Sequence, residues 1–310
     1  MPACRVGSRS GRLIRLCGRR PTTSFHLRFM YPGLTATIYN VMPCICEGKN
    51  IAMVKMIGRH SIKRGENRSV MMGDILLYES DTGILKALID GEYITTLRTG
   101  LTAAHSARLF TRKDFQTVGL IGPGNIMTVC IRSLISSLRE EGDDRVITLK
   151  LIRYHGHEER IMKFLKADKN LRFELCDSYE SVIRDSDLVI SAITKVTENF
   201  ASNDCFKEGV TVIPVCTLGF QNCDLFFDKV FTDEIEQIRG FKYFSHFEPI
   251  TTNVSDVLNG LRPGRTNNTD RILVCNYGIA IHDLLLAENI WKKAENQSVE
   301  YDYCREKYFI

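Results

Sequence analysis

Apolar and polar positions alternate along residues 34–90, in short runs that turn residues separate. Alternation with a period of two is typical of strands that bury one face. Four strands are expected, at residues 36–41, 51–56, 74–78 and 85–89. The apolar spacing becomes helical over residues 95–109, so this first block is predicted to be an α+β unit.

The pattern changes after residue 114, where short apolar strands alternate with helices. The expected strands are residues 117–121, 146–152, 172–175, 188–193, 210–215 and 229–232. Helices are expected up to about residue 138 and at residues 158–165 and 179–184. Alternation at this spacing predicts βαβ units and a parallel sheet. Beyond residue 240 the pattern predicts helices again, the last and longest over residues 279–294.

The composition is that of an ordinary globular protein: the chain has 310 residues, 44% hydrophobic and 25% charged. No apolar run is long enough to cross a bilayer, so no membrane partner is expected. The net charge of +4 comes from one end, because residues 1–46 hold seven of the 41 Lys and Arg and no acid. The other 264 residues therefore carry 34 basic and 37 acidic side chains. Nucleic-acid binding would depend on this basic N-terminal segment alone, and we expect no nucleic-acid partner.

The eleven cysteines do not form a metal-binding or disulfide pattern. Their only close pair is Cys44 and Cys46, and there is no C-x-x-C. No metal site is expected. We expect buried thiols instead, in a reducing, cytoplasmic compartment. Residues 1–23 are rich in Arg and Ser and free of acid, which resembles a mitochondrial transit peptide but equally fits a solvated basic tail.

A glycine loop follows the first strand of the second block, in the sequence TVGLIGPGNIM at residues 117–127. In a strand–loop–helix unit, Gly122 would allow the tight turn and Gly124 the close approach of a pyrophosphate. The new helix would present its free N–H groups at Asn125 and Ile126. The third position of the G-x-G-x-x-G fingerprint is Met127, so the fingerprint is incomplete. Its placement still predicts a dinucleotide site.

The next strand leaves the choice between NAD and NADP open. It ends without the acid that usually takes the ribose hydroxyls of NAD, and carries Arg153 there instead. Arg153 could bind the 2′-phosphate of NADP, or it could merely close the end of the strand. NAD is the cofactor we expect, with NADP possible.

Two cations are candidates for binding a substrate carboxylate. Lys55 lies inside an apolar strand, on the face that carries Ile51 and Met53, where an unpaired ammonium would be costly. Arg98 begins a helix. Beside a nicotinamide site the two would hold a carboxylate, and a desolvated Lys can lose its proton near neutral pH. Ordinary salt bridges are the alternative for each.

The combination of motifs resembles the ornithine cyclodeaminase/mu-crystallin family. Residues 73–107 (GDILLYESDTGILKALIDGEYITTLRTGLTAAHSA), the glycine loop and residues 255–294 (SDVLNGLRPGRTNNTDRILVCNYGIAIHDLLLAENIWKKA) carry the resemblance. It implies a Rossmann domain inserted into an α+β substrate and dimerisation domain, and a homodimer. The domains expected are 113–271 for the Rossmann part and 31–112 with 272–310 for the substrate part. Residues 1–30 would be a poorly ordered basic arm.

The resemblance also assigns roles to single residues. Lys55 matches the family's active-site lysine and Arg98 its carboxylate-binding arginine, although Gly100 replaces an alanine of that motif. Arg28 matches a second carboxylate-binding arginine only loosely. The residues expected around the cofactor are Thr99, Gly122, Gly124, Asn125, Ile126, Met127, Arg153, Thr194, Leu218 and Gly219.

Two departures from the family affect the expected chemistry. Gln221 stands where cyclodeaminases carry an aspartate that handles the substrate amino group, unless the loop shifts to offer Asp224. Glutamine cannot act as a general base, which puts ammonia release in doubt. The basic arm also stands where the family has covering helices.

The leading expectation is an ornithine cyclodeaminase-like enzyme that converts L-ornithine to L-proline with NAD and releases ammonia by way of an imine. The alternatives are an NAD(P)H-dependent ketimine reductase or an alanine- or opine-type dehydrogenase, with an amino acid or imine as substrate. A nicotinamide-binding protein that has lost turnover is the alternative of another class.

Overall fold

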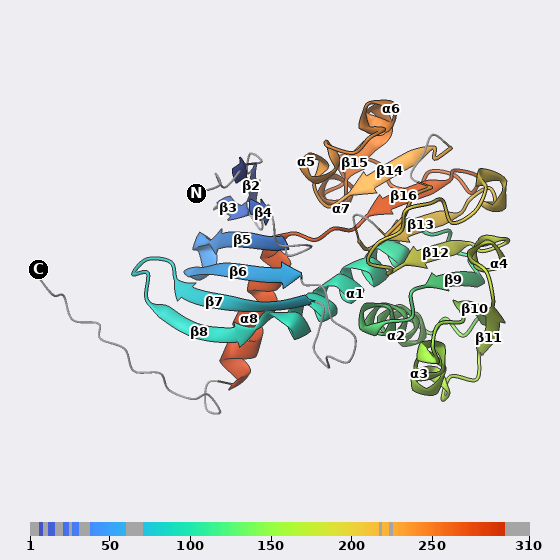
Figure 1. Cartoon of the computed structure of the whole chain (residues 1–310), viewed down its shortest axis with the longest axis horizontal. Helices are drawn as coiled ribbons and strands as arrows, with labels where there is room; N and C mark the ends of the chain where they lie inside the picture. Colours follow the sequence, from blue (N-terminus) through green and yellow to red (C-terminus); the bar gives the residue numbers. More distant parts are fainter. Residues whose placement is uncertain are drawn as a thin grey trace, which may run out of the picture. The chain divides into compact units, whose positions relative to one another are not determined.

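The computed structural model describes residues 38–59, 71–216, 219–222 and 226–294, with the backbone of four short strands before them. The chain forms two compact units, residues 1–92 with 280–310 and residues 93–279 (Figure 1). These limits differ from the expected domains for a physical reason. Strand β16 (Ile272–Cys275) pairs inside the sheet of the second unit, and helix α1 (Gly91–Phe110) contributes apolar residues to the core of that unit.

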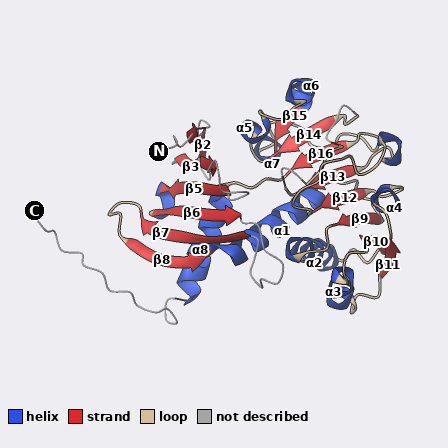
Figure 2. Cartoon of the chain, viewed as in Figure 1, coloured by secondary structure: helices blue, strands red, loops and turns tan. Residues whose placement is uncertain are grey.

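The first unit is an antiparallel sheet with one helix on it. The sheet joins β5 (Ile38–Cys46), β6 (Ile51–Arg59), β7 (Met71–Glu79) and β8 (Leu85–Asp90) in chain order. Helix α8 (Ala280–Ala294) packs against these strands (Figure 2). Alternate residues of β6 are buried on the helix side, as a period of two requires.

Four further strands precede β5 in the basic arm. Strands β3 and β4 each pair antiparallel with β5, β1 pairs with β4, and β2 pairs with β3. Their bounds are β1 Val6–Ser8, β2 Arg12–Arg15, β3 Pro21–Ser24 and β4 Leu27–Met30.

The second unit is a parallel sheet in the order β11-β10-β9-β12-β13-β16-β14-β15. All strands run parallel, but the chain adds β10 and β11 on one side of β9 and β12 on the other. This change of side is the switch point at which doubly wound sheets bind ligands. The bounds are β9 Thr117–Ile121, β10 Ile147–Ile152, β11 Leu171–Cys176, β12 Leu188–Ser191, β13 Thr211–Pro214, β14 Lys229–Thr232, β15 Thr251–Asn253 and β16 Ile272–Cys275.

Helices cover the parallel sheet, whose central strands β12 and β13 are buried along their whole length. One apolar core includes Leu120, Met127 and Leu149, and a second includes Val189, Phe206 and Phe220. The helices after α1 are α2 Asn125–Glu140, α3 His157–Leu165, α4 Tyr179–Ile183, α5 Ile235–Ile238, α6 Phe244–Phe247 and α7 Val254–Leu258. Single 3-10 turns lie at Glu47–Lys49, Asn203–Cys205 and Glu248–Ile250.

The mixed α/β architecture with a Rossmann-type parallel sheet and a separate antiparallel sheet confirms the expected fold class. The expectation for the chain beyond residue 240 was wrong in part, because β15 and β16 are strands there. All four residues of β16 are buried apolar residues. A short continuous apolar run has no periodicity that separates a buried strand from a helix.

Two findings concern the expected environment of the protein. Within the described ranges, no helix is long and apolar enough to cross a membrane. The described cysteines are free thiols, and five of them are buried: Cys44, Cys130, Cys176, Cys205 and Cys275. Burial raises the pKa of the Cys130 thiol to about 12, so this group stays protonated and unreactive near neutral pH.

Asp187 joins the strand starts at the amino edge of the parallel sheet. One carboxylate oxygen accepts hydrogen bonds from the backbone N–H of Gln116 at 2.9 Å and of Thr117 at 3.0 Å. The other lies 2.7 Å from Lys207 Nζ. Burial alone would raise the pKa of Asp187, but Lys207 and the two N–H donors outweigh it and hold the pKa below its ordinary value.

We therefore expect Asp187→Asn to lower the free energy of unfolding by about 2–3 kcal/mol at neutral pH. A lowered pKa in the folded state adds stability above the unfolded-state pKa of about 4, and this stability disappears as the pH falls through the folded value. Urea unfolding should show a larger difference between variant and parent at pH 7 than at pH 3. An equal difference at both values would contradict the assignment.

Candidate functional site

The loop after β9 has the geometry that the glycine motif requires. Gly122 adopts a φ of +84°, and a Cβ on it would lie 2.9 Å from the carbonyl carbon of Ala192. Any other residue would meet both the strain of a left-handed backbone and this collision. The N–H of Gly124 donates to the carbonyl of Gly122 at 2.8 Å, which closes the turn directly before α2.

The first turn of α2 is open to an anion. Within the described chain no side chain caps this end, and no acid lies in its first turn. A Cβ placed on Gly124 would meet nothing within 4 Å, so the space in front of the helix is free. The N–H groups of the first turn and the helix dipole can therefore hold a pyrophosphate. Met127 is fully buried and packs in the apolar core, so the missing third glycine is replaced by a core side chain.

The loops after β12 and β13 are tied to each other. Ser191 Oγ donates to the carbonyl of Gly219 at 2.6 Å, and Gln221 Nε2 donates to the carbonyl of Val196 at 2.9 Å. Thr194 is exposed on the first of these loops. Gln221 therefore uses its amide to hold the backbone, while Leu218 and Asp224 lie outside the described residues.

Arg153 follows β10 at the same edge of the sheet. Its Nε lies 2.8 Å from Asp177, the residue that follows β11. Because all these strands are parallel, the residues after β9, β10, β11 and β12 gather at one edge. Sequence reasoning named Arg153 and missed Asp177, although an acid directly after an apolar strand is a recognisable signal.

Arg98 lies in α1 and is 92% buried, since only 8% of its surface is exposed. Its guanidinium group packs directly against Gly278, where any side chain would collide with it. Asp233 holds this segment: its carboxylate accepts from Gly278 N–H at 2.7 Å and from Asn276 Nδ2 at 3.1 Å. The neighbouring Thr99 is also buried. Sequence reasoning identified Arg98 and Thr99 and missed Asp233, Asn276 and Gly278.

Gly100, the departure from the family motif, lies where α1 meets α2. A Cβ at this position would lie 2.7 Å from the side chain of Val129 and 2.9 Å from the backbone nitrogen of Cys130. The alanine of the family motif would not fit without a shift of α2. Gly100 thus serves close helix packing.

Lys55 forms a buried ion pair in the first unit. It lies on the helix side of β6, and its ammonium group pairs with the carboxylate of Asp283 in α8. Both side chains are completely buried. The sequence placed Lys55 on the inner face but gave no partner, although Asp283 interrupts the apolar stripe of its helix. The backbone of Arg28 lies opposite Asn40 in the β4–β5 pair, and its side chain is outside the described part.

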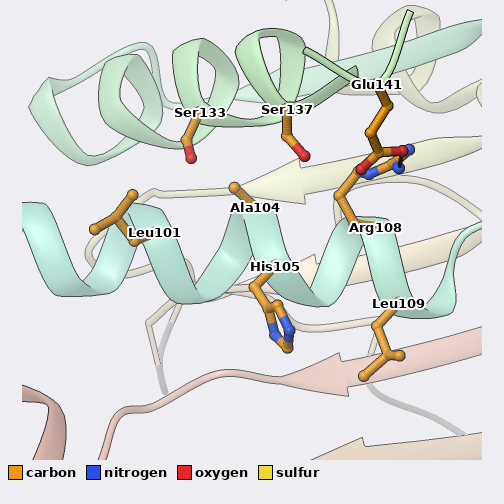
Figure 3. A pocket seen from close by; sticks show the side chains of 8 residues that line it. All are labelled: Leu101, Ala104, His105, Arg108, Leu109, Ser133, Ser137 and Glu141. Carbon is orange, nitrogen blue, oxygen red and sulfur yellow. Dashed lines mark hydrogen bonds and ion pairs between the residues drawn. The ribbon is translucent and has the colours of Figure 1, made fainter. Parts of the chain in front are cut away.

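A separate hollow lies between α1 and α2, within the second unit. Figure 3 shows Ser133 and Ser137 pointing from α2 towards α1, whereas His105 points away from them. At one end the hollow is closed by the Arg108–Glu141 ion pair, which neutralises its strongest charges. It contains no residue from the strand ends, so we do not assign it to the site.

Comparisons with known proteins agree with this geometry. The sequence profile of the ornithine cyclodeaminase/mu-crystallin family matches residues 33–298. The nodulation efficiency protein NfeD of Rhizobium meliloti is 26% identical over 270 residues, which cover 83% of this chain and 80% of that protein.

Two solved structures share the fold. Thermococcus litoralis Δ1-pyrroline-2-carboxylate reductase in complex with NADH and L-proline superposes with a TM-score of 0.74 at 19% identity, covering 90% of this chain and 88% of that one. An archaeal alanine dehydrogenase dimer with bound NAD gives a TM-score of 0.75 at 18% identity, covering 92% and 89%.

The Lys55–Asp283 pair should dominate the stability of the first unit. We expect Lys55→Met or Asp283→Leu alone to cost about 3–5 kcal/mol, because each leaves a buried charge without its counter-charge. The double variant should lose far less than the sum of the two single losses. Urea unfolding of the four proteins measures the coupling, and additive losses would show that the two side chains do not interact.

Proposed function

Because the chain belongs to the ornithine cyclodeaminase/mu-crystallin family, we propose that it is an NAD(P)-dependent oxidoreductase of the imine reductase and amino acid dehydrogenase type. The observation that carries the proposal is the open first turn of α2 behind Gly122, at the switch point of a parallel sheet. The relatives that bind NADH with L-proline, and NAD, support the same cofactor class.

The residues present fit a nicotinamide dinucleotide. The free N–H groups of Asn125, Ile126 and Met127 would hold its pyrophosphate, and the exposed Thr194 and the loop at Gly219 line the same edge of the sheet. When bound, the cofactor supplies or accepts a hydride at a carbon that carries nitrogen. The remaining tasks, which are binding the carboxylate and moving the proton, fall to the protein.

Arg98 and Lys55 divide these tasks by their chemistry. A guanidinium stays charged at any pH the protein experiences, so Arg98 can clamp a carboxylate with two parallel hydrogen bonds but cannot supply a proton. An ammonium can supply one, and the carboxylate of Asp283 is the counter-charge beside Lys55. We assign Lys55 the proton that the nitrogen gains when the C=N bond is reduced, and Asp283 the positioning of Lys55.

The position of Gln221 favours reduction over cyclodeamination. Its amide is bonded to the carbonyl of Val196, and an amide cannot exchange protons with a substrate amine. Conversion of L-ornithine to L-proline with release of ammonia therefore needs Asp224 in that role. The substrates we propose are a cyclic imine with a carboxylate, or a keto acid with an amine.

The sheet of the first unit suggests a homodimer. Its face away from α8 carries exposed apolar side chains, with Met56 48% and Leu88 67% exposed. Exposed apolar side chains on one face of a sheet are typical of an interface. We propose that a second copy of the chain covers it, as the dimeric alanine dehydrogenase relative suggests, and that the protein with its free thiols works in the cytoplasm.

The activity can be measured as oxidation of NADH or NADPH, monitored by absorbance, with Δ1-pyrroline-2-carboxylate or pyruvate plus ammonia as substrate. Turnover is expected with at least one of them. Arg98→Lys should raise KM by about 10- to 100-fold, because one guanidinium hydrogen bond to a carboxylate is lost. Arg108→Lys is the matched control on the same helix, and its KM should not change.

The other outcomes separate the alternatives. Proline formed from L-ornithine and NAD⁺ would identify a cyclodeaminase. Nicotinamide binding without turnover of any substrate would identify a binding protein and overturn the proposed enzyme.

The dimer can be tested by sedimentation velocity. Leu88→Glu should convert a dimer to a monomer, because it places a charge among the exposed apolar side chains of this face. Leu261→Glu is the control, since Leu261 is 70% exposed but lies in the second unit. A parent protein that sediments as a monomer would rule the interface out.

A further inference from the structure

The end of β10 carries a group of basic and aromatic side chains that the proposed reaction does not use. In this fold the adenosine ribose of a dinucleotide lies at the end of the strand next to the glycine loop, which here is β10. We propose that this edge binds the 2′-phosphate of NADP(H) through Arg153, so that the protein prefers NADP(H) to NAD(H). The inference rests on the proposed dinucleotide site.

Arg153 occupies the position from which NAD-binding proteins present an acid to the ribose hydroxyls. Its side chain is 54% exposed, and Asp177 is the one ion-pair partner recorded for it in the described chain. That contact involves Nε, and the half-exposed guanidinium remains accessible to a second anion. A guanidinium is permanently charged and matches the geometry of a phosphate.

The acidic side chain that follows Arg153 is buried, whereas the neighbouring aromatic ring is exposed. Glu158 is only 6% exposed, and its carboxylate accepts from the N–H of Tyr154 at 3.0 Å. This hydrogen bond, with the charge of Arg153, keeps the pKa of Glu158 below its ordinary value. Tyr154 is 54% exposed, and its ring contacts those of His155 and His157 edge-on. The exposed ring is suited to stacking on an adenine.

A second arginine connects this loop to the phosphate-binding turn. Arg160 of α3 donates from Nη2 to the carbonyl of Pro123, at 3.3 Å, between the two glycines of the loop. One guanidinium therefore lies at the pyrophosphate end and another, on Arg153, at the ribose end. A cation at the ribose end, in addition to the one at the pyrophosphate end, favours a ligand with one more phosphate than NAD.

Asp177 determines what happens when Arg153 is removed. Its side chain is 83% exposed and its carboxylate is neutralised by Arg153. Without that partner the carboxylate would repel a 2′-phosphate and could accept hydrogen bonds from ribose hydroxyls instead. Arg153 and Asp177 thus form a pair in which each residue favours a different cofactor.

Binding of NADPH and NADH to the full chain, measured by calorimetry, tests the inference without any substrate. NADPH should bind at least about tenfold more tightly, and 2′,5′-ADP should compete better than 5′-ADP. Arg153→Ala should weaken NADPH by about 10- to 100-fold and leave NADH nearly unchanged. Asp177→Asn should strengthen NADPH, because it removes the carboxylate that competes for Arg153, and should leave NADH nearly unchanged.

Arg172→Ala is the matched control, because Arg172 is an exposed arginine at the opposite, amino end of neighbouring β11. It should change neither affinity. Equal affinities of the parent protein for both dinucleotides, or an equal loss of both in Arg153→Ala, would overturn the preference while the oxidoreductase proposal stands. If neither dinucleotide binds, the proposed function itself falls, and the inference falls with it.

Discussion

The buried pair of Lys55 and Asp283 is the contact on which the organisation of this chain depends. Its two members are separated by 228 residues, and neither charge could be buried alone. Helix α8 must therefore return to the antiparallel sheet in which β6 lies. Everything between β8 and α8 is then an excursion that starts and ends at the first unit. The pair is thus one contact that holds α8 on the antiparallel sheet after this excursion.

The inserted part uses a different constraint to gather its functional groups. In a parallel sheet all strands end at the same edge, so residues far apart in the chain become neighbours there. Gly122, Arg153 and Thr194 reach this edge from three neighbouring strands of the sheet, β9, β10 and β12. Asp233 and Asn276 reach it from the later strands β14 and β16. The left-handed turn at Gly122 then leaves the end of α2 uncovered. The edge is polar because loops can satisfy polar groups there, whereas the central strands β12, β13 and β16 are buried along their whole length.

The sequence was sufficient wherever a residue's role follows from its own neighbours in the chain. The alternation around Lys55 placed it on the inner face, and the turn chemistry of the glycine loop placed its helix. The roles that depend on a distant partner were missed. Nothing near Lys55 points to Asp283, and nothing near Arg98 points to Gly278 and Asp233. Strand β16 was missed for a related reason, because its position between β13 and β14 is a property of the sheet and its four apolar residues have no readable period.

The chemistry that the fold can support turns on how protons are handled. Gln221 is held by a backbone carbonyl and has no proton that a substrate amine could exchange, and Arg98 never releases its own. Under the proposed function, the ammonium of Lys55, which pairs with Asp283, is assigned the proton that the nitrogen gains. We therefore propose imine reduction rather than ammonia loss, because an amide stands at position 221, where a carboxylate would accept the proton of the substrate amine.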